Sequence, residues 1–327
     1  DHRLGANEAP PAIISVFIGE AMTKLLNGIV NGKNTDGQEV KRALDLLAKL
    51  PNLEIDNTDR NRTSPFAFTG NKFEIRAVGS SQNCAGPMTV MNTIMGAQLQ
   101  KFKAEVDKLI AKGDSQDEAI LTVLKGLIRK SKPICFEGNN YSDEWKNEAE
   151  RRGLPNKPNT PDALDAMITP KAEKLYLSTN VLSKIELHAQ YEIALHGYCT
   201  KLDIEAKTMD ELCRNHILPA ANRFQVELAE AIASMQEIGM GDAADFQKET
   251  LKSVATNVST IHKSLKSMEK AIHEAEATGD TRQAADRFCN VVKPIMETVR
   301  TAADELESLV DDQYWPLVKY REMLFMR

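Results

Sequence analysis

Apolar residues in the C-terminal third of the chain recur at alternating intervals of three and four positions. One such run covers residues 251–272 and a second covers residues 288–309, with a Thr-Gly-Asp turn at 278–280 between them. This interval is that of a heptad seam, along which one helix packs against another. The pattern predicts two long antiparallel helices forming a hairpin, with the seam as its core or, alternatively, as a partner surface. Pro294 lies inside the second run, so it should kink that helix or mark a delayed start.

The other hydrophobic patterns predict a mostly helical chain with one short β region. Helices are expected at residues 12–30 after a short extended entry, at 38–50, 88–112 and 115–130, and almost continuously from about residue 182. Prolines and glycines make residues 131–170 irregular, with one short charged helix. A few antiparallel strands are expected within residues 63–78. The predicted fold class is α+β and predominantly helical, with a domain boundary within residues 105–135.

The predicted β region carries an unusual row of charges. Lys72, Glu74 and Arg76 alternate with apolar residues, so their three side chains share one face of a strand. A row of cation, carboxylate and cation is a poor core surface, and in isolation it is typical of a solvated edge strand. Placed in a cleft, the same row suits a metal ion and anionic ligands.

Composition narrows the function classes. The 327 residues are 42% hydrophobic and 27% charged, which is typical of a globular protein. The net charge of −6 disfavours binding to nucleic-acid phosphates, and no apolar run approaches the roughly 20 residues of a membrane span. The five cysteines are scattered without a C-x-x-C pair. They therefore favour a reducing cytoplasm over a disulfide framework or a zinc knuckle.

One further group of residues imitates a metal site. His188, Glu192 and His196 lie four residues apart on one face of a predicted helix. Two imidazoles and one carboxylate in a helix of a bundle favour ordinary interhelical hydrogen bonding over metal binding. The other histidines and the cysteines are interpreted as structural or exposed.

Three segments together resemble the glutamine synthetases. Their flap is similar to the segment Arg3-Leu4-Gly5-Ala6-Asn7-Glu8-Ala9-Pro10. Their Asn-Arg-Ser motif at the ATP site is similar to Asn61-Arg62-Thr63-Ser64, and their basic-x-Glu-x-Arg strand is similar to Lys72-Phe73-Glu74-Ile75-Arg76. The three segments occur in family order. The residues around them are similar to type III glutamine synthetase, the long-chain bacterial form. The chain opens inside the first motif without an initiating Met, so we expect it to be the C-terminal portion of such an enzyme.

The resemblance implies a domain division and an activity. Residues 1–115 are expected to be the C-terminal part of a glutamine synthetase catalytic domain, and residues 116–327 a helical C-terminal domain. The implied reaction is ATP-dependent ligation of ammonia to glutamate through γ-glutamyl phosphate, with Mg²⁺ or Mn²⁺ on the phosphate oxygens. Family members form rings, typically dodecamers, to which the helical domain is expected to contribute. Because the other metal-binding glutamates of the family lie upstream, the chain alone is expected to be inactive.

The resemblance also assigns roles to residues of the first two motifs. Arg3 would bind the substrate glutamate, a task suited to a guanidinium group. Glu8 would close the flap over the acyl phosphate and take a proton from ammonium. Arg62 would contact ATP and stabilise the transferring phosphate.

The strand residues receive roles in the same way. Lys72 would contact ATP, Glu74 would bind the metal ion through its hard oxygen atoms, and Arg76 would bind substrate or the leaving phosphate. Two departures from the family pattern stand out. About 50 residues separate the flap from Arg62, and Ala67 replaces a second arginine five positions after Arg62.

Two other functions remain open at this level. The chain could be a non-catalytic helical scaffold that retains a degenerate enzyme remnant. In that case, replacing Glu74 would leave the turnover of the complete enzyme unchanged. It could also be a related γ-glutamyl-amine ligase with a bulkier nucleophile. The flap glutamate Glu8 favours ammonia, because a bulkier amine needs a more open flap.

Overall fold

The computed structural model describes residues 13–31, 63–69, 72–76 and 83–324. The chain divides into two compact units. The first, here called the sheet unit, comprises residues 1–163 with 169–184, and the second, the helical unit, comprises residues 164–168 with 185–327. None of the described helices is long and apolar enough to cross a membrane. The predominantly helical fold expected from the sequence is confirmed.

The sheet unit contains a three-stranded sheet in the order β1-β2-β3. Strand β1 (Val16–Phe17) pairs parallel with β2 (Phe66–Phe68), and β2 pairs antiparallel with β3 (Phe73–Ile75). The antiparallel pair confirms the strands expected within residues 63–78. The remaining strand, β1, is formed by the extended residues before the first helix. Its Val16 and Phe17 lie opposite Phe66 and Ala67 of β2.

The rest of the described part of this unit is largely helical. Its helices are α1 (Glu20–Asn31), α3 (Ala85–Ile110), α4 (Gln116–Ser131), α5 (Asp143–Arg151), α6 (Thr160–Leu164) and α7 (Pro170–Thr179), with a 3₁₀ turn at Lys132–Ile134. The 3₁₀ turn at Asp165–Ile168, after α6, belongs to the helical unit. Helix α4 begins with a capping box, in which the Ser115 hydroxyl accepts from the backbone N–H of Glu118 and the Glu118 carboxylate accepts from that of Ser115. The expected helix at residues 38–50 lies outside the described residues.

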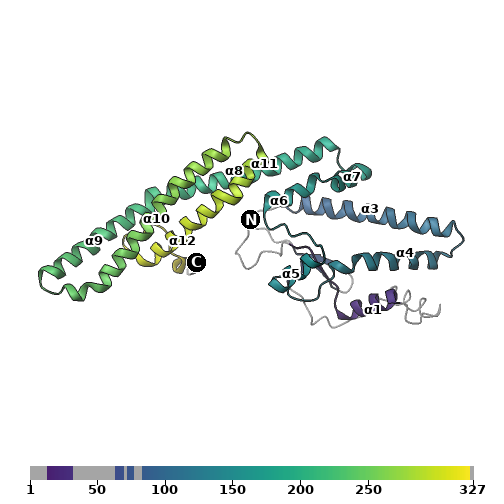
Figure 1. Cartoon of the computed structure of the whole chain (residues 1–327), viewed down its shortest axis with the longest axis horizontal. Helices are drawn as coiled ribbons and strands as arrows, with labels where there is room; N and C mark the ends of the chain where they lie inside the picture. Colours follow the sequence, from purple (N-terminus) through teal and green to yellow (C-terminus); the bar gives the residue numbers. More distant parts are fainter. Residues whose placement is uncertain (1–12, 32–62, 70–71, 77–82, 325–327) are drawn as a thin grey trace. The chain divides into compact units, whose positions relative to one another are not determined.

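Four long helices and two short ones make up most of the described part of the helical unit (Figure 1). They are α8 (Lys184–Leu212), α9 (Leu218–Glu237), α10 (Asp245–Glu276), α11 (Thr281–Arg287), α12 (Lys293–Leu309) and α13 (Tyr320–Met323), with a 3₁₀ turn at Gly241–Ala244. Helix α10 packs along both α9 and α12. The helical hairpin predicted from the two heptad seams is therefore confirmed.

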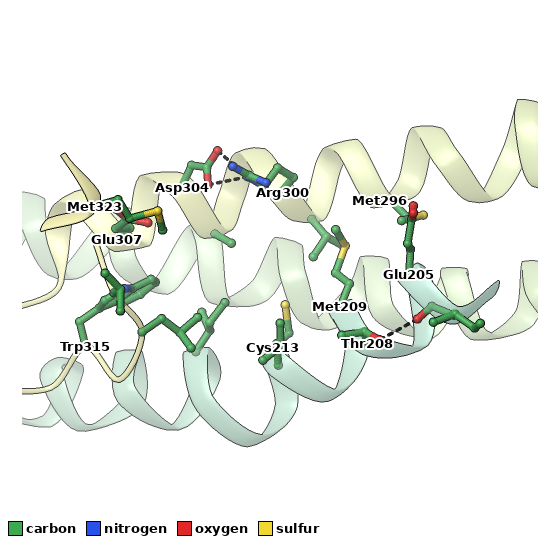
Figure 2. A pocket seen from close by; sticks show the side chains of 17 residues that line it. Glu205, Thr208, Met209, Cys213, Met296, Arg300, Asp304, Glu307, Trp315 and Met323 are labelled. Carbon is green, nitrogen blue, oxygen red and sulfur yellow. Dashed lines mark hydrogen bonds and ion pairs between the residues drawn. The ribbon is translucent and has the colours of Figure 1, made fainter. Parts of the chain in front are cut away.

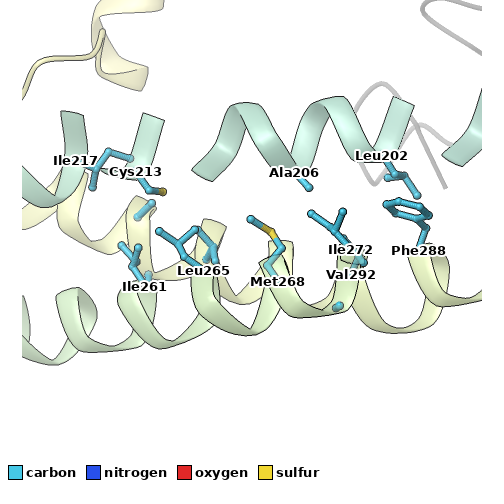
Figure 3. Close-up of a cluster of buried hydrophobic side chains, with 14 of the residues drawn as sticks. Leu202, Ala206, Cys213, Ile217, Ile261, Leu265, Met268, Ile272, Phe288 and Val292 are labelled. Atoms are coloured by element: carbon cyan, nitrogen blue, oxygen red, sulfur yellow. The ribbon is translucent and has the colours of Figure 1, made fainter. Parts of the chain in front are cut away.

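Side chains of the predicted seams form the main core of the helical unit (Figure 3). Ile261, Leu265 and Met268 on α10 are almost fully buried. Phe288 and Val292, in the second helical arm of the hairpin, are almost fully buried as well. Helix α8 contributes Leu202 and Ala206 to the same cluster in Figure 3. The heptad positions thus pack inside the unit rather than facing a partner.

Both prolines within the long helices of the helical unit follow a π-helical turn. One turn covers Cys213–Ile217 before Pro219, and the other covers Phe288–Val292 before Pro294. In each case the residue before the proline donates to a carbonyl five residues back, Leu218 to Cys213 and Lys293 to Phe288. Proline has no N–H to donate, and wider turns of this kind absorb that loss. Pro294 therefore marks the delayed start of α12.

The last helix is shorter than the pattern near the C-terminus predicts. The spacing of apolar residues after Trp315-Pro316 predicts a helix whose Leu317 and Leu324 dock on the bundle. Leu317 does pack against the main core, whereas helix α13 has a single turn and Leu324 is 80% exposed. Trp315 supplies the anchor in its place, because its side chain is buried in the main core.

Candidate functional site

The charged residue of β3, Glu74, and the two that flank the strand, Lys72 and Arg76, lie together in the structure. Arg76 Nη2 is 3.1 Å from one carboxylate oxygen of Glu74, and Lys72 Nζ is 3.9 Å from the other. Their side chains share one side of the strand because residues two apart in a strand point the same way. Glu74 lies opposite Ala67 on β2, whose small, buried side chain leaves room for the carboxylate.

The ion pairs of this row are weak as stabilising interactions. The side chains of Lys72, Glu74 and Arg76 are 67%, 42% and 25% exposed. Pairs at such exposure contribute about 0–1 kcal/mol to stability, because water screens them. Little free energy is therefore needed for Glu74 to exchange a cationic side chain for a ligand. The row carries a net positive charge, which suits an anionic ligand.

The other face of β3 borders a cavity within the sheet unit. Phe73 packs its ring against Phe68 at 5.2 Å between centroids, and it remains 53% exposed. The cavity has a volume of about 770 Å³ and is lined by Phe73 together with residues of β1, α1, α4 and α5. The apolar face that the alternation predicts is thus only partly covered by the described residues.

A buried polar network anchors the segment before β2. Thr63 Oγ1 accepts from the backbone N–H of Asn140 at 3.0 Å, and the hydroxyl of Ser15 donates to the Asn140 side chain. The hydroxyl of Ser64 donates to the carbonyl of Phe66 at 2.7 Å. Ser15, Ser64 and Asn140 are almost completely buried. Thr63 and Ser64 are the last two residues of the Asn-Arg-Thr-Ser motif, so this network holds that end of the motif in place.

A second anchor joins β1 to the same loop. The carboxylate of Glu137 accepts from the backbone N–H groups of Ile18 and Gly19, at 3.4 and 3.1 Å, and from the Thr23 hydroxyl at 3.1 Å. These donors surround the N-terminus of α1, where a negative charge is favourable. Sequence patterns do not single out Glu137 or Asn140. The only signal is the Gly-Asn-Asn turn at residues 138–140, which indicates a loop without indicating what it contacts.

The other expected site residues cannot be placed. Arg3, Glu8 and Arg62 lie outside the described residues. The structure therefore brings together Lys72, Glu74 and Arg76. The relation of these residues to Arg3, Glu8 and Arg62 stays a prediction.

The described residues do not form a metal site by themselves. Within residues 13–31, 63–69, 72–76 and 83–324, no group of three His, Cys, Asp or Glu side chains is arranged to hold an ion. Glu74 offers suitable hard oxygen atoms but needs further ligands. His196 instead shares a 3.3 Å contact with the hydroxyl of Thr200 on its own helix.

The amino-acid sequence is similar to those of known proteins over the whole length of the chain. Residues 119–236, from α4 into α9, match the glutamine synthetase C-terminal domain family. The complete chain is 42% identical to a glutamine synthetase of Bacteroides fragilis and 37% identical to the type-3 glutamine synthetase of Dictyostelium discoideum. A glutamine synthetase of Butyrivibrio fibrisolvens is 34% identical over 99% of the chain.

The chain spans about half the length of these curated relatives, covering 46%, 45% and 46% of them. The aligned stretch spans β3 as well as the helices, because it extends over the complete chain in the first two comparisons. This protein is thus similar along its length to part of a glutamine synthetase, the type-3 form included, and its residues 119–236 match the C-terminal domain of that family.

Proposed function

We propose that this chain is the C-terminal part of a type III glutamine synthetase. The complete enzyme would join ammonia to glutamate at the expense of ATP, through γ-glutamyl phosphate, releasing ADP and phosphate. The observation that carries this proposal is the row formed by Lys72, Glu74 and Arg76 on β3, in a chain similar throughout to enzymes of that name.

The geometry of the row supports a role for each member. Arg76 is the least exposed of the three, so its guanidinium is held in place to bind an oxyanion of the substrate or of phosphate. Lys72 is the most exposed, and its flexible ammonium suits contact with ATP. Glu74 lies between them as one proposed ligand of Mg²⁺ or Mn²⁺. A divalent ion, when bound, neutralises the phosphate oxygens of ATP.

The residues outside the described ranges complete the proposal. Arg3 would bind glutamate, Glu8 would close the flap and accept the ammonium proton, and Arg62 would stabilise the transferring phosphoryl group. The anchors at Thr63 and Asn140 support this arrangement, because they hold the chain rigid immediately after Arg62.

Substitution of Glu74 in the complete enzyme tests the proposal. Glu74→Ala should lower metal-dependent γ-glutamyl transfer by more than about 100-fold, since loss even of outer-shell residues costs 10–100-fold at metal sites. Glu150→Ala is the matched control, because Glu150 is an exposed glutamate of the same unit on α5. Unchanged turnover in Glu74→Ala would instead support the non-catalytic scaffold.

Two properties of the complete protein follow from the same proposal. A dodecamer in the cytoplasm is expected, which the native mass of the purified enzyme checks. The chain of 327 residues should make no glutamine alone, because Glu74 cannot hold the metal ions unaided. Glutamine formation by the isolated chain would contradict this expectation.

A further inference from the structure

The helical unit contains a cavity that the proposed ligase reaction does not use. It has a volume of about 660 Å³ and lies between α8, the π-helical turn at Cys213–Ile217, α12 and residues 315–323 (Figure 2). Small-molecule sites in proteins have volumes of about 300–1,000 Å³. The cavity therefore has the size of a site for a small organic ligand.

Its interior is apolar and rich in sulfur. Met209, Cys213, Met296 and Trp315 line it, as Figure 2 shows. Burial raises the pKa of the Cys213 thiol to about 11, so this group is neutral at physiological pH and behaves as a small apolar side chain. Methionine side chains are flexible and adapt to ligands of different shape. An apolar ligand body therefore suits the interior.

The charged residues around the cavity are mostly acidic. Three carboxylates, those of Glu205, Asp304 and Glu307, line it together with a single guanidinium, that of Arg300. Arg300 is held by Asp304 through two contacts of its Nε atom, at 2.7 and 2.8 Å. The lining therefore carries a net negative charge, which favours a cation over an anion or a neutral molecule.

The chain itself places an alkylammonium group beside the same indole ring. Lys319 is buried, and its Nζ atom lies 5.9 Å from the centre of the Trp315 ring. That ammonium donates to the carbonyl of Val310 at 3.0 Å and pairs with Asp312 at 2.7 Å. Aromatic faces attract organic cations. The surroundings of Trp315 thus already stabilise a cation with an aliphatic stem.

We propose that this cavity binds an organic cation with an apolar body, of the alkylammonium or aralkylammonium class. The apolar body would occupy the interior between Met209, Met296 and Trp315. The cationic group would lie at one end of the cavity, beside the carboxylate of Glu205 or that of Glu307, which Figure 2 shows at opposite ends. This inference concerns a ligand site in the helical unit and is independent of the ligase proposal.

Three probes with the same ten-carbon chain test the charge preference. Decyltrimethylammonium, decanoate and decanol are titrated separately into the 327-residue chain, below the concentrations at which they aggregate. Trp315 fluorescence and calorimetry report binding. The cation should bind with a Kd roughly fivefold lower or more than either other probe, because one favourable charge interaction contributes about 1 kcal/mol. Equal affinity for all three probes, or no binding of the cation, would overturn the proposal.

Variants that replace glutamate by glutamine test which carboxylates cause the preference for the cationic probe. The double variant Glu205→Gln/Glu307→Gln should lose most of the preference for the cation while still binding decanol. Glu297→Gln is the matched control, because Glu297 is an exposed glutamate of α12 that does not line the cavity. Thermal unfolding of each variant checks that the helical unit remains folded. A double variant that keeps the full preference would show that these carboxylates do not recognise the ligand.

Discussion

At the scale of single residues, Asp165 joins three parts of the helical unit. Its carboxylate accepts from the hydroxyl of Tyr191 on α8 at 2.8 Å and from two nitrogen atoms of Arg282 on α11 at 2.9 and 3.0 Å. Arg282 also pairs with Asp286 at 2.7 Å. Burial, together with the hydrogen bond to Asp165, raises the pKa of Tyr191 to about 12.

The raised pKa of Tyr191 predicts a change of stability at alkaline pH. The folded state prefers the neutral phenol, so its contribution is complete below the unfolded pKa of about 10 and is lost as the pH rises through 12. Tyr191→Phe should lower the free energy of unfolding by about 1 kcal/mol at pH 7. That difference should shrink when urea unfolding is repeated at pH 11.

The control for this prediction is Tyr141→Phe, which changes an exposed tyrosine. It should leave the free energy of unfolding nearly unchanged at both pH values. A difference between wild type and Tyr191→Phe that stays the same from pH 7 to pH 11 would contradict the assigned pKa.

At the scale of elements, the packing of α10 against its neighbours dominates the helical unit. Val254, Ile261, Leu265 and Met268, four of the seam positions of this helix, are each at most 1% exposed. The only strongly polar residue buried along α10 is Asn257, whose side-chain amide donates to Glu305 of α12 at 3.0 Å. Such a polar contact favours one alignment of the two helices over others.

Truncation of a seam residue should therefore be costly. Leu265→Ala should lower the free energy of unfolding by about 3 kcal/mol, because it removes buried atoms and leaves a cavity. Lys266→Ala, at the exposed neighbouring position, should change it by less than about 0.5 kcal/mol. Chemical denaturation monitored by circular dichroism measures both. Equal effects of the two substitutions would show that the seam is not the core of this unit.

At the scale of the whole molecule, the division into units does not follow the chain strictly. Residues 164–168 belong to the helical unit although residues 169–184 belong to the sheet unit. Leu164, Met167 and Ile168 pack against the main core, and Asp165 holds Arg282. This short segment therefore contributes to the stability of the helical unit. The boundary expected from sequence, at residues 115 and 116, stays a prediction.

Two fragments test the contribution of the short segment. A fragment of residues 164–327 should unfold cooperatively, whereas one of residues 185–327 should have a Tm lower by about 5 °C or more, since it loses the contacts of Asp165 and three apolar side chains. Calorimetry of both fragments provides the measurement. Equal Tm values would show that residues 164–168 are not part of this folding unit.

The sequence alone determined the features that depend on short-range periodicity. The seven-residue spacing predicts the hairpin, because every seam position repeats within two turns of one helix. The alternation around Glu74 predicts that the three charged side chains share a side of β3, as their contacts confirm. The capping box at Ser115 is local in the same sense. Each signal lies within a few residues of the structure it specifies.

Tertiary structure alone decided which distant segments meet. The hydrogen bond between Thr63 and Asn140 spans 77 residues, and the contact of Glu137 with Gly19 spans 118. The cavity beside Trp315 likewise forms only when α8 and α12 pack around it. No periodicity encodes such pairings, because they arise from packing entire elements together. For this reason the charges of the candidate site could be predicted, whereas the buried groups that anchor it could not.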